Sequence, residues 1–102
     1  MNNINAEQFA QMMEQENTVV LDVRMPQELV EGSVPNYVMI NFFGSEFETE
    51  VDKLDKSKTY LVYCRSGNRS SQACAMMSDM GFENLYNLLG GIGAWNAYAM
   101  AH

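Results

Sequence analysis

The sequence predicts an α/β protein in which helices cover both faces of a parallel sheet. Short β-branched or apolar segments, which suit buried strands, alternate with segments whose apolar residues recur every three or four positions, as on one face of a helix. This alternation is typical of βαβ units and parallel sheets. The 102 residues, 47% of them hydrophobic, are enough for one domain spanning residues 1–102.

The first half of the chain contains three predicted helices and two predicted strands. A helix begins after Ile4, where Asn5 can act as the N-cap and Gln8 stands at the capping-box position. Pro26 suits the first turn of a short second helix. A third helix is predicted after a second capping box formed by Ser45 and Glu48, with Phe47, Val51 and Leu54 on one face. The strands are predicted over residues 18–23 and 37–42.

The second half continues the same alternation. The clearest strand is predicted over residues 59–63, and a polar loop over residues 64–69 connects it to a helix that ends near Met80. A last strand is predicted over residues 85–89. Two glycines then lead into a final helix that carries Trp95, for which packing in the core is expected.

The charge balance argues against nucleic acid and membranes as partners. Six Lys and Arg residues stand against 13 Asp and Glu residues, which gives a net charge of −7. A chain this acidic is repelled by phosphate backbones and anionic lipid surfaces. No segment resembles a secretory signal or a membrane span, so a cytoplasmic protein with reduced thiols is expected. Four of the six cations nevertheless lie together in a stretch without acids: Lys56, Lys58, Arg65 and Arg69.

The small number of cysteines and histidines limits the chemistry. A zinc site needs four protein ligands, or three and a water molecule, and the three candidates Cys64, Cys74 and His102 are scattered along the chain. His102 is the last residue, a poor position for the base of a cysteine–histidine dyad. No metal and no cofactor are therefore expected.

The candidate site is the polar segment that follows the strand predicted to end at Tyr63. It reads Cys64, Arg65, Ser66, Gly67, Asn68, Arg69 and Ser70. A tight loop at a helix N-terminus directs several backbone N–H groups toward one point and binds anions. Together with the two arginines, such a loop favours the thiolate of Cys64, which is the nucleophilic form. A buried and inert cysteine would need none of this polarity.

The length of this loop distinguishes two chemistries. Cysteine phosphatases have five residues between the cysteine and an arginine, so that the loop encircles a phosphoryl group. Here only four residues separate Cys64 from Arg69, and Ser70 occupies the arginine position of a phosphatase. A phosphatase or arsenate reductase is therefore the less favoured alternative.

Three motifs, in order along the chain, resemble the rhodanese, or thiosulfate sulfurtransferase, family. The loop from Cys64 to Ser70 is similar to the active loop of single-domain rhodaneses. The other two motifs are an N-terminal signature and a C-terminal Gly-Gly-x-x-x-Trp, carried by Leu21 to Arg24 with Pro26, Glu28, Gly32 and Pro35, and by Gly90 to Ile92 with Trp95. The resemblance implies a three-layer fold with a five-stranded parallel sheet. The chain departs from the family pattern at Ser33, Asn36 and Tyr37.

The resemblance also implies a sulfurtransferase reaction. Cys64 would take sulfane sulfur from a small anionic donor, thiosulfate or a persulfide, and pass it from a Cys64 persulfide to cyanide, a thiol or a thioredoxin-like protein. Backbone N–H groups from Arg65 to Ser70 would hold the persulfide, Arg65 and Arg69 would orient the donor, and the Ser66 hydroxyl would hydrogen-bond the sulfur. The alternative is a regulatory or sulfur-carrier binding module of the same fold.

Two further residues have structural interpretations. Arg24 is expected to form an ion pair with Glu28 that fixes the turn, rather than to contact substrate. Cys74 lies ten residues beyond Cys64, beside the apolar helix face that includes Met77. We expect it to fill space in the core rather than to act as a resolving thiol.

Overall fold

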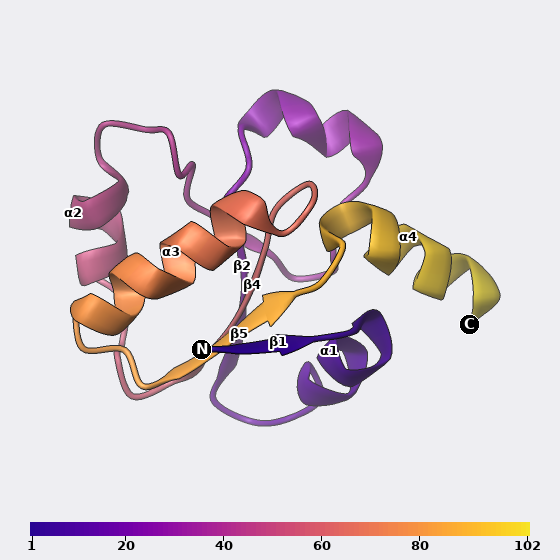
Figure 1. Ribbon diagram of the computed structural model, residues 1–102, viewed down its shortest axis with the longest axis horizontal. Helices are drawn as coiled ribbons and strands as arrows, with labels where there is room; N and C mark the ends of the chain where they lie inside the picture. The colour runs from indigo at the N-terminus through magenta and orange to yellow at the C-terminus, as the bar shows by residue number, and fades with distance from the viewer.

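The structure, a computed structural model, describes residues 1–102 and contains a five-stranded sheet between two layers of helices (Figure 1). The order across the sheet is β1-β5-β4-β2-β3, and every neighbouring pair is parallel. The predicted α/β architecture is confirmed. The strands are β1 (Asn2–Ile4), β2 (Thr18–Asp22), β3 (Val38–Met39), β4 (Thr59–Tyr63) and β5 (Asn84–Leu88).

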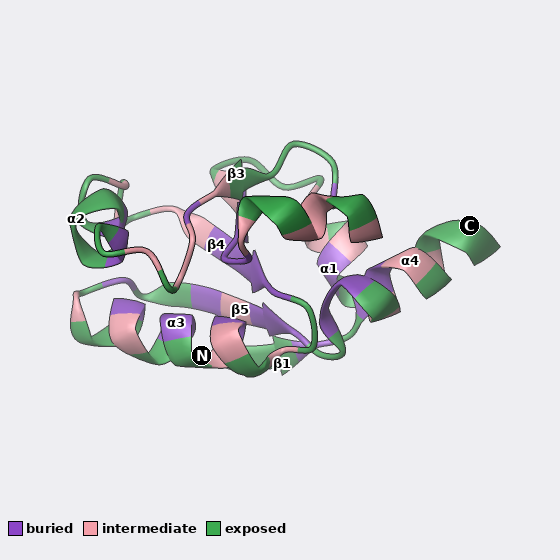
Figure 2. Cartoon of the chain, turned by 90° about the horizontal axis from the view of Figure 1, so that it is seen from above, coloured by how far each residue is buried: buried purple, intermediate pink, exposed green.

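The helices divide the core into two clusters, one on each face of the sheet. They are α1 (Ala6–Met12), the 3₁₀ helix η1 (Pro26–Glu31), α2 (Phe47–Asp52), α3 (Asn68–Asp79) and α4 (Gly91–Ala101). One face packs against α2 and α3, through residues such as Val51 and Met77, and the other against α1 and α4, through Phe9 and Trp95. Figure 2 shows the buried positions along β4 and β5 and the exposed end of α4. None of the helices is long and apolar enough to cross a membrane.

The N-terminus of α1 forms as the sequence predicts. The backbone N–H of Gln8 donates to Asn5 Oδ1 at 2.8 Å, and the backbone N–H of Asn5 donates to Gln8 Oε1 at 2.9 Å. This capping box satisfies N–H groups that have no partner within the helix. It also fixes the turn by which the chain leaves β1 and passes under the sheet.

Two strands differ from the sequence prediction. β1 was not predicted, because its polar residues Asn2 and Asn3 give no strand pattern, and its position depends on parallel pairing with β5. The strand predicted over residues 37–42 is reduced to β3. Beyond it, the N–H groups of Ile40 and Phe42 still donate to β2 and to Val23, but a turn that begins at Asn41 interrupts the regular ladder.

The second predicted capping box does not form. Helix α2 begins one residue later than Ser45 would require, with Glu46 at the N-cap and no side-chain cap. The reason is the preceding turn, in which Gly44 N–H donates to Asn41 O and Phe47 N–H donates to Gly44 O. That turn uses the chain up to Gly44 and shifts the start of the helix past the serine. Phe47 nevertheless lies on the buried face, as predicted.

Candidate functional site

The loop that carries Cys64 lies at the carboxyl edge of the sheet, directly after β4. Its tight turn depends on Gly67, which has a φ of 106° and stands at the N-cap of α3. A side chain at this left-handed φ would be strained. The helix starts at Asn68, so Arg69 and Ser70 fall within its first turn rather than in the loop. Open sheets of this kind bind ligands outside the carboxyl ends of their strands.

Hydrogen-bond donors converge on the sulfur of Cys64. The Gly67 N–H lies 3.1 Å from Cys64 Sγ and the Ser70 hydroxyl 3.3 Å from it, and the N–H groups of Ser66 and Ser70 also point to it. Burial alone would raise the pKa of this fully buried thiol. The hydrogen bonds outweigh that effect and hold the pKa of Cys64 below its ordinary value. The loop therefore stabilises a negative charge on sulfur.

The hydroxyl that reaches the sulfur belongs to Ser70, not to Ser66 as expected. Ser66 is exposed, whereas Ser70 is fully buried and faces inward from the first turn of α3. Ser70 Oγ also contacts Asn87 Oδ1, and Asn87 Nδ2 donates to Asn3 Oδ1 at 3.0 Å. Sequence reasoning missed Asn87. The signal available was an amide between two apolar residues, Tyr86 and Leu88, near the end of strand β5.

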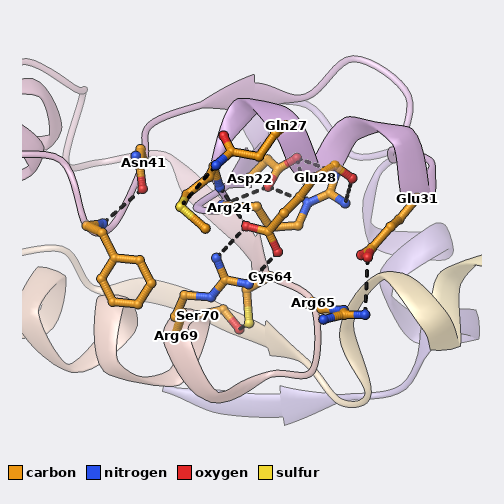
Figure 3. A network of polar contacts seen from close by, with 12 residues as sticks. Asp22, Arg24, Gln27, Glu28, Glu31, Asn41, Cys64, Arg65, Arg69 and Ser70 are labelled. Atoms are coloured by element: carbon orange, nitrogen blue, oxygen red, sulfur yellow. Dashed lines mark hydrogen bonds and ion pairs between the residues drawn. The ribbon is translucent and has the colours of Figure 1, made fainter.

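The two predicted arginines are both paired with carboxylates of η1 (Figure 3). Both Nη atoms of Arg69 lie 2.6 Å from the carboxylate oxygens of Glu28, in a bidentate pair. Arg65 Nη2 lies 3.2 Å from Glu31 Oε2 and is much more exposed. The guanidinium of Arg69 also lies over the exposed ring of Phe43, 5.6 Å from its centroid. Asn68 is exposed, at the start of α3.

The expected ion pair between Arg24 and Glu28 is wrong. Arg24 pairs instead with Asp22, at 2.8 Å, and both side chains are fully buried. The guanidinium reaches only backbone carbonyls of the following turn, those of Glu28 at 3.1 Å and Gly32 at 2.9 Å. The side chain of Glu28 is thereby left free to turn toward Arg69. Glu28 thus pairs with Arg69 rather than with Arg24, its neighbour in the sequence, because η1 folds back over the Cys64 loop.

The Asp22–Arg24 pair belongs to a buried network that supports η1. The Tyr63 hydroxyl donates to Asp22 Oδ2 at 2.7 Å and accepts from the Val34 N–H at 3.2 Å. Buried charges are stable only when their hydrogen-bonding capacity is satisfied, and this pair meets that condition. The network connects β2, β4 and η1 behind the Cys64 loop.

The two glycines after β5 explain how α4 supports the loop. Gly91 has a φ of 57°, and a Cβ at this position would lie 2.4 Å from Arg65 O and 2.5 Å from Cys64 O. The next residue, Ile92, donates its N–H to Cys64 O at 3.0 Å. The backbone of α4 thus approaches the loop so closely that only glycine fits. The Gly-Gly motif therefore has a structural reason in this chain.

Cys74 lies in the interior of α3, within the apolar cluster that also contains Ala73 and Met77. Burial raises the pKa of this thiol to about 12, because few polar groups offset the loss of solvent. The position agrees with the expected role as a core residue. The predicted packing of Trp95 in the core is also confirmed, with its ring 6.1 Å from that of Phe9.

Comparison with known proteins assigns the family. The family model of the Rhodanese-like domain matches residues 5–98 of the chain. The chain belongs to the rhodanese-like family. The resemblance carried by the three motifs is therefore confirmed, and so is the rhodanese-like fold.

Similar proteins include two bacterial proteins named sulfurtransferase or putative sulfurtransferase and one solved rhodanese-related structure. A protein of Allochromatium vinosum named sulfurtransferase is 31% identical over 100 residues, which cover 97% of this chain and 92% of that protein. The putative sulfurtransferase YtwF of Bacillus subtilis is 36% identical over a stretch that covers 78% of this chain and 75% of that protein. The crystal structure of a rhodanese-related protein from Thermoplasma volcanium superposes with a TM-score of 0.83 at 35% identity, covering 96% of this chain and 93% of that one.

Proposed function

We propose that this rhodanese-like protein transfers sulfane sulfur through a persulfide on Cys64. The observation that carries the proposal is the convergence of backbone N–H groups and the Ser70 hydroxyl on Cys64 Sγ. These donors would stabilise the attacking thiolate and the persulfide anion that replaces it. The names of the relatives, sulfurtransferase and putative sulfurtransferase, support the same reaction class.

The transfer has two balanced steps. With thiosulfate as donor, the Cys64 thiolate attacks the outer sulfur, the sulfur–sulfur bond of thiosulfate breaks, and its electron pair leaves on sulfite. With a persulfide donor, a thiolate leaves instead. In the second step cyanide, a small thiol or a thioredoxin-like protein attacks the outer sulfur of the Cys64 persulfide and restores the thiolate. No external oxidant or reductant is required.

Intact mass spectrometry tests the proposal directly. After incubation with thiosulfate or a thiosulfonate, we expect the protein to gain the mass of one sulfur atom, and cyanide should remove it with release of thiocyanate. Cys64→Ser should show no gain, while Cys74→Ser should behave as the wild type. If the wild type gains no sulfur from any donor, the binding-module alternative replaces the enzyme proposal. Hydrolysis of para-nitrophenyl phosphate or reduction of arsenate would instead favour the phosphatase-like alternative.

A further inference from the structure

The side-chain cations next to Cys64 are already neutralised within the protein. Arg69 forms a bidentate pair with Glu28, at 2.6 Å for each contact, and Arg65 pairs with Glu31 at 3.2 Å. Both carboxylates come from η1, which lies against the loop (Figure 3). A donor that arrives at Cys64 therefore meets backbone N–H dipoles but no unpaired guanidinium at either position.

The Arg69–Glu28 pair is the more firmly held of the two. Both side chains are largely buried, with 15% and 12% exposure, whereas Arg65 is 66% exposed. Glu28 Oε2 also accepts the Met25 N–H at 2.8 Å, which ties the carboxylate to its own helical turn. The hydrogen bonds from Arg69 hold the pKa of Glu28 down at about 2, so protonation near neutral pH does not release the arginine.

The position of Glu28 is set by the buried network behind it. Arg24 donates to the backbone carbonyls of Glu28 and Gly32, and these bonds anchor both ends of the turn that carries the carboxylate. Arg24 itself is fixed by Asp22. To bind Arg69, a donor anion would have to displace the carboxylate of Glu28, and the backbone of Glu28 is held in place by these hydrogen bonds.

The balance of charges around the Cys64 loop favours sulfur donors of low negative charge. Three guanidinium groups, of Arg24, Arg65 and Arg69, are matched by three carboxylates, so the Cys64 thiolate adds one uncompensated negative charge. Thiosulfate would bring two further negative charges to this site, and a thiol persulfide would bring at most one at its reacting end. Like charges in a partly buried site repel more strongly than in water.

We infer that Glu28 is a specificity-determining residue, which makes the site select thiol persulfides over the dianion thiosulfate by neutralising Arg69. This inference rests on the proposed function. In the favoured step the Cys64 thiolate attacks the outer sulfur of R–S–SH, the sulfur–sulfur bond breaks, and its electron pair leaves on R–S⁻. Cys64 then carries –S–SH, so atoms and charge balance without a further reactant.

Two donors that differ by one charge test the inference. Thiosulfate and methanethiosulfonate both transfer a terminal sulfur from a sulfonyl group, but the second is a monoanion. The rate at which each loads sulfur onto Cys64 is measured by quenched-flow mass spectrometry in the wild type and in Glu28→Gln. We expect the ratio of thiosulfate to methanethiosulfonate rates to rise about tenfold in the variant, because Arg69 becomes available to the second charge. The intrinsic reactivities of the donors cancel in this comparison.

Glu50→Gln is the matched control, because it removes the same charge from an exposed ion pair with Lys53 on α2. Its ratio should change by less than about twofold. An unchanged ratio in Glu28→Gln, or an equal loss with both donors, would overturn the inference. Loading of the wild type by neither donor would overturn the proposed function itself.

A second measurement needs no variant. Salt should accelerate loading of the wild type by thiosulfate more than by methanethiosulfonate, because it screens repulsion. If salt instead slows thiosulfate more, the site attracts the dianion and the inference fails.

Discussion

Cys64 and Cys74 are two fully buried thiols of the same core cluster, and their chemical environments are opposite. Cys64 follows β4, where three backbone N–H groups and a hydroxyl point at its sulfur, and its pKa is lowered although burial acts to raise it. Cys74 lies in mid-helix, among Ala73, Met77 and the sheet, and its pKa is raised to about 12. The two thiols are ten residues apart in the sequence, one in the loop that precedes α3 and the other within α3.

The comparison shows that burial alone does not set the direction in which the pKa of a thiol shifts, because the hydrogen-bond donors around the sulfur can outweigh it. In the interior of α3 the backbone N–H groups are used in the helix itself, so none remains for Cys74. At the N-terminus of the same helix these groups have no intrahelical partners and are free to bind an anion. One helix therefore provides a position where a thiolate is stabilised and a position where it is not.

Exchange of the two cysteines for serine should give the largest difference. Cys64→Ser is expected to abolish sulfur transfer from thiosulfonate to cyanide, because an alcohol at this position cannot form the persulfide. Cys74→Ser should retain most of the activity, at some cost in stability for burying a hydroxyl among apolar groups. Thiocyanate release and thermal unfolding measure the two effects. Equal loss of activity in both variants would remove the distinction between the thiols.

A methyl group beneath the loop should disturb Cys64 and leave Cys74 unchanged. In Gly91→Ala the new Cβ would overlap Arg65 O and Cys64 O, and the positive φ adds roughly 1–2 kcal/mol of strain. We expect lower stability and a large loss of sulfur loading.

Gly93→Ala is the control for this substitution, since nothing lies within 4 Å of its Cβ. Alanine in a helix should stabilise the fold by roughly 0.5–1 kcal/mol and leave loading intact. Wild-type loading in Gly91→Ala would show that the close approach of α4 does not shape the loop.

Removal of one hydrogen-bond donor to Cys64 Sγ should reduce, but not abolish, the difference in pKa between the two thiols. Ser70→Ala deletes the only side-chain hydroxyl at Cys64 Sγ, which disfavours the thiolate and raises the pKa of Cys64. We expect alkylation of Cys64 near neutral pH to slow about tenfold, the size of one hydrogen bond to a charged group. Ser66→Ala should have a far smaller effect, because its exposed hydroxyl contributes nothing and its N–H remains. If Ser66→Ala instead slowed alkylation more than Ser70→Ala, the hydroxyl of Ser66 would have the role first expected for it.

Local chemistry explains what the sequence could predict. The strand before Cys64, the glycine in the loop and the start of a helix are features of adjacent residues, so a loop whose N–H groups converge on Cys64 could be predicted. The choice between Ser66 and Ser70 could not, because it depends on the turn at which α3 begins. Similarly, Glu28 and Arg69 stand in two separate motifs 41 positions apart, and their contact exists only once η1 has folded over the loop.

β1 illustrates the same limit in the fold. Its residues Asn2 and Asn3 carry no strand pattern, and the strand exists because β5 offers an unpaired edge. On β5, Asn87 lies opposite Asn3 and donates a hydrogen bond to it. Only the assembled sheet shows that an amide in β5 connects the N-terminal strand to Ser70 and the sulfur.

The pH dependence of alkylation at the two cysteines tests the central claim most directly. The protein is treated with iodoacetamide over a pH series, and the modification of each cysteine is measured by peptide mass spectrometry, with the unfolded protein as reference. Because only the thiolate reacts and its pKa is lowered, the rate at Cys64 should level off at a lower pH than that of an ordinary thiol, with a pKa of about 8.5, and Cys74 should stay unmodified. Excess sulfite should slow the reaction at Cys64. If Cys64 titrates like a free cysteine, reacts no faster than Cys74 and is not protected by anions, the loop does not activate its sulfur.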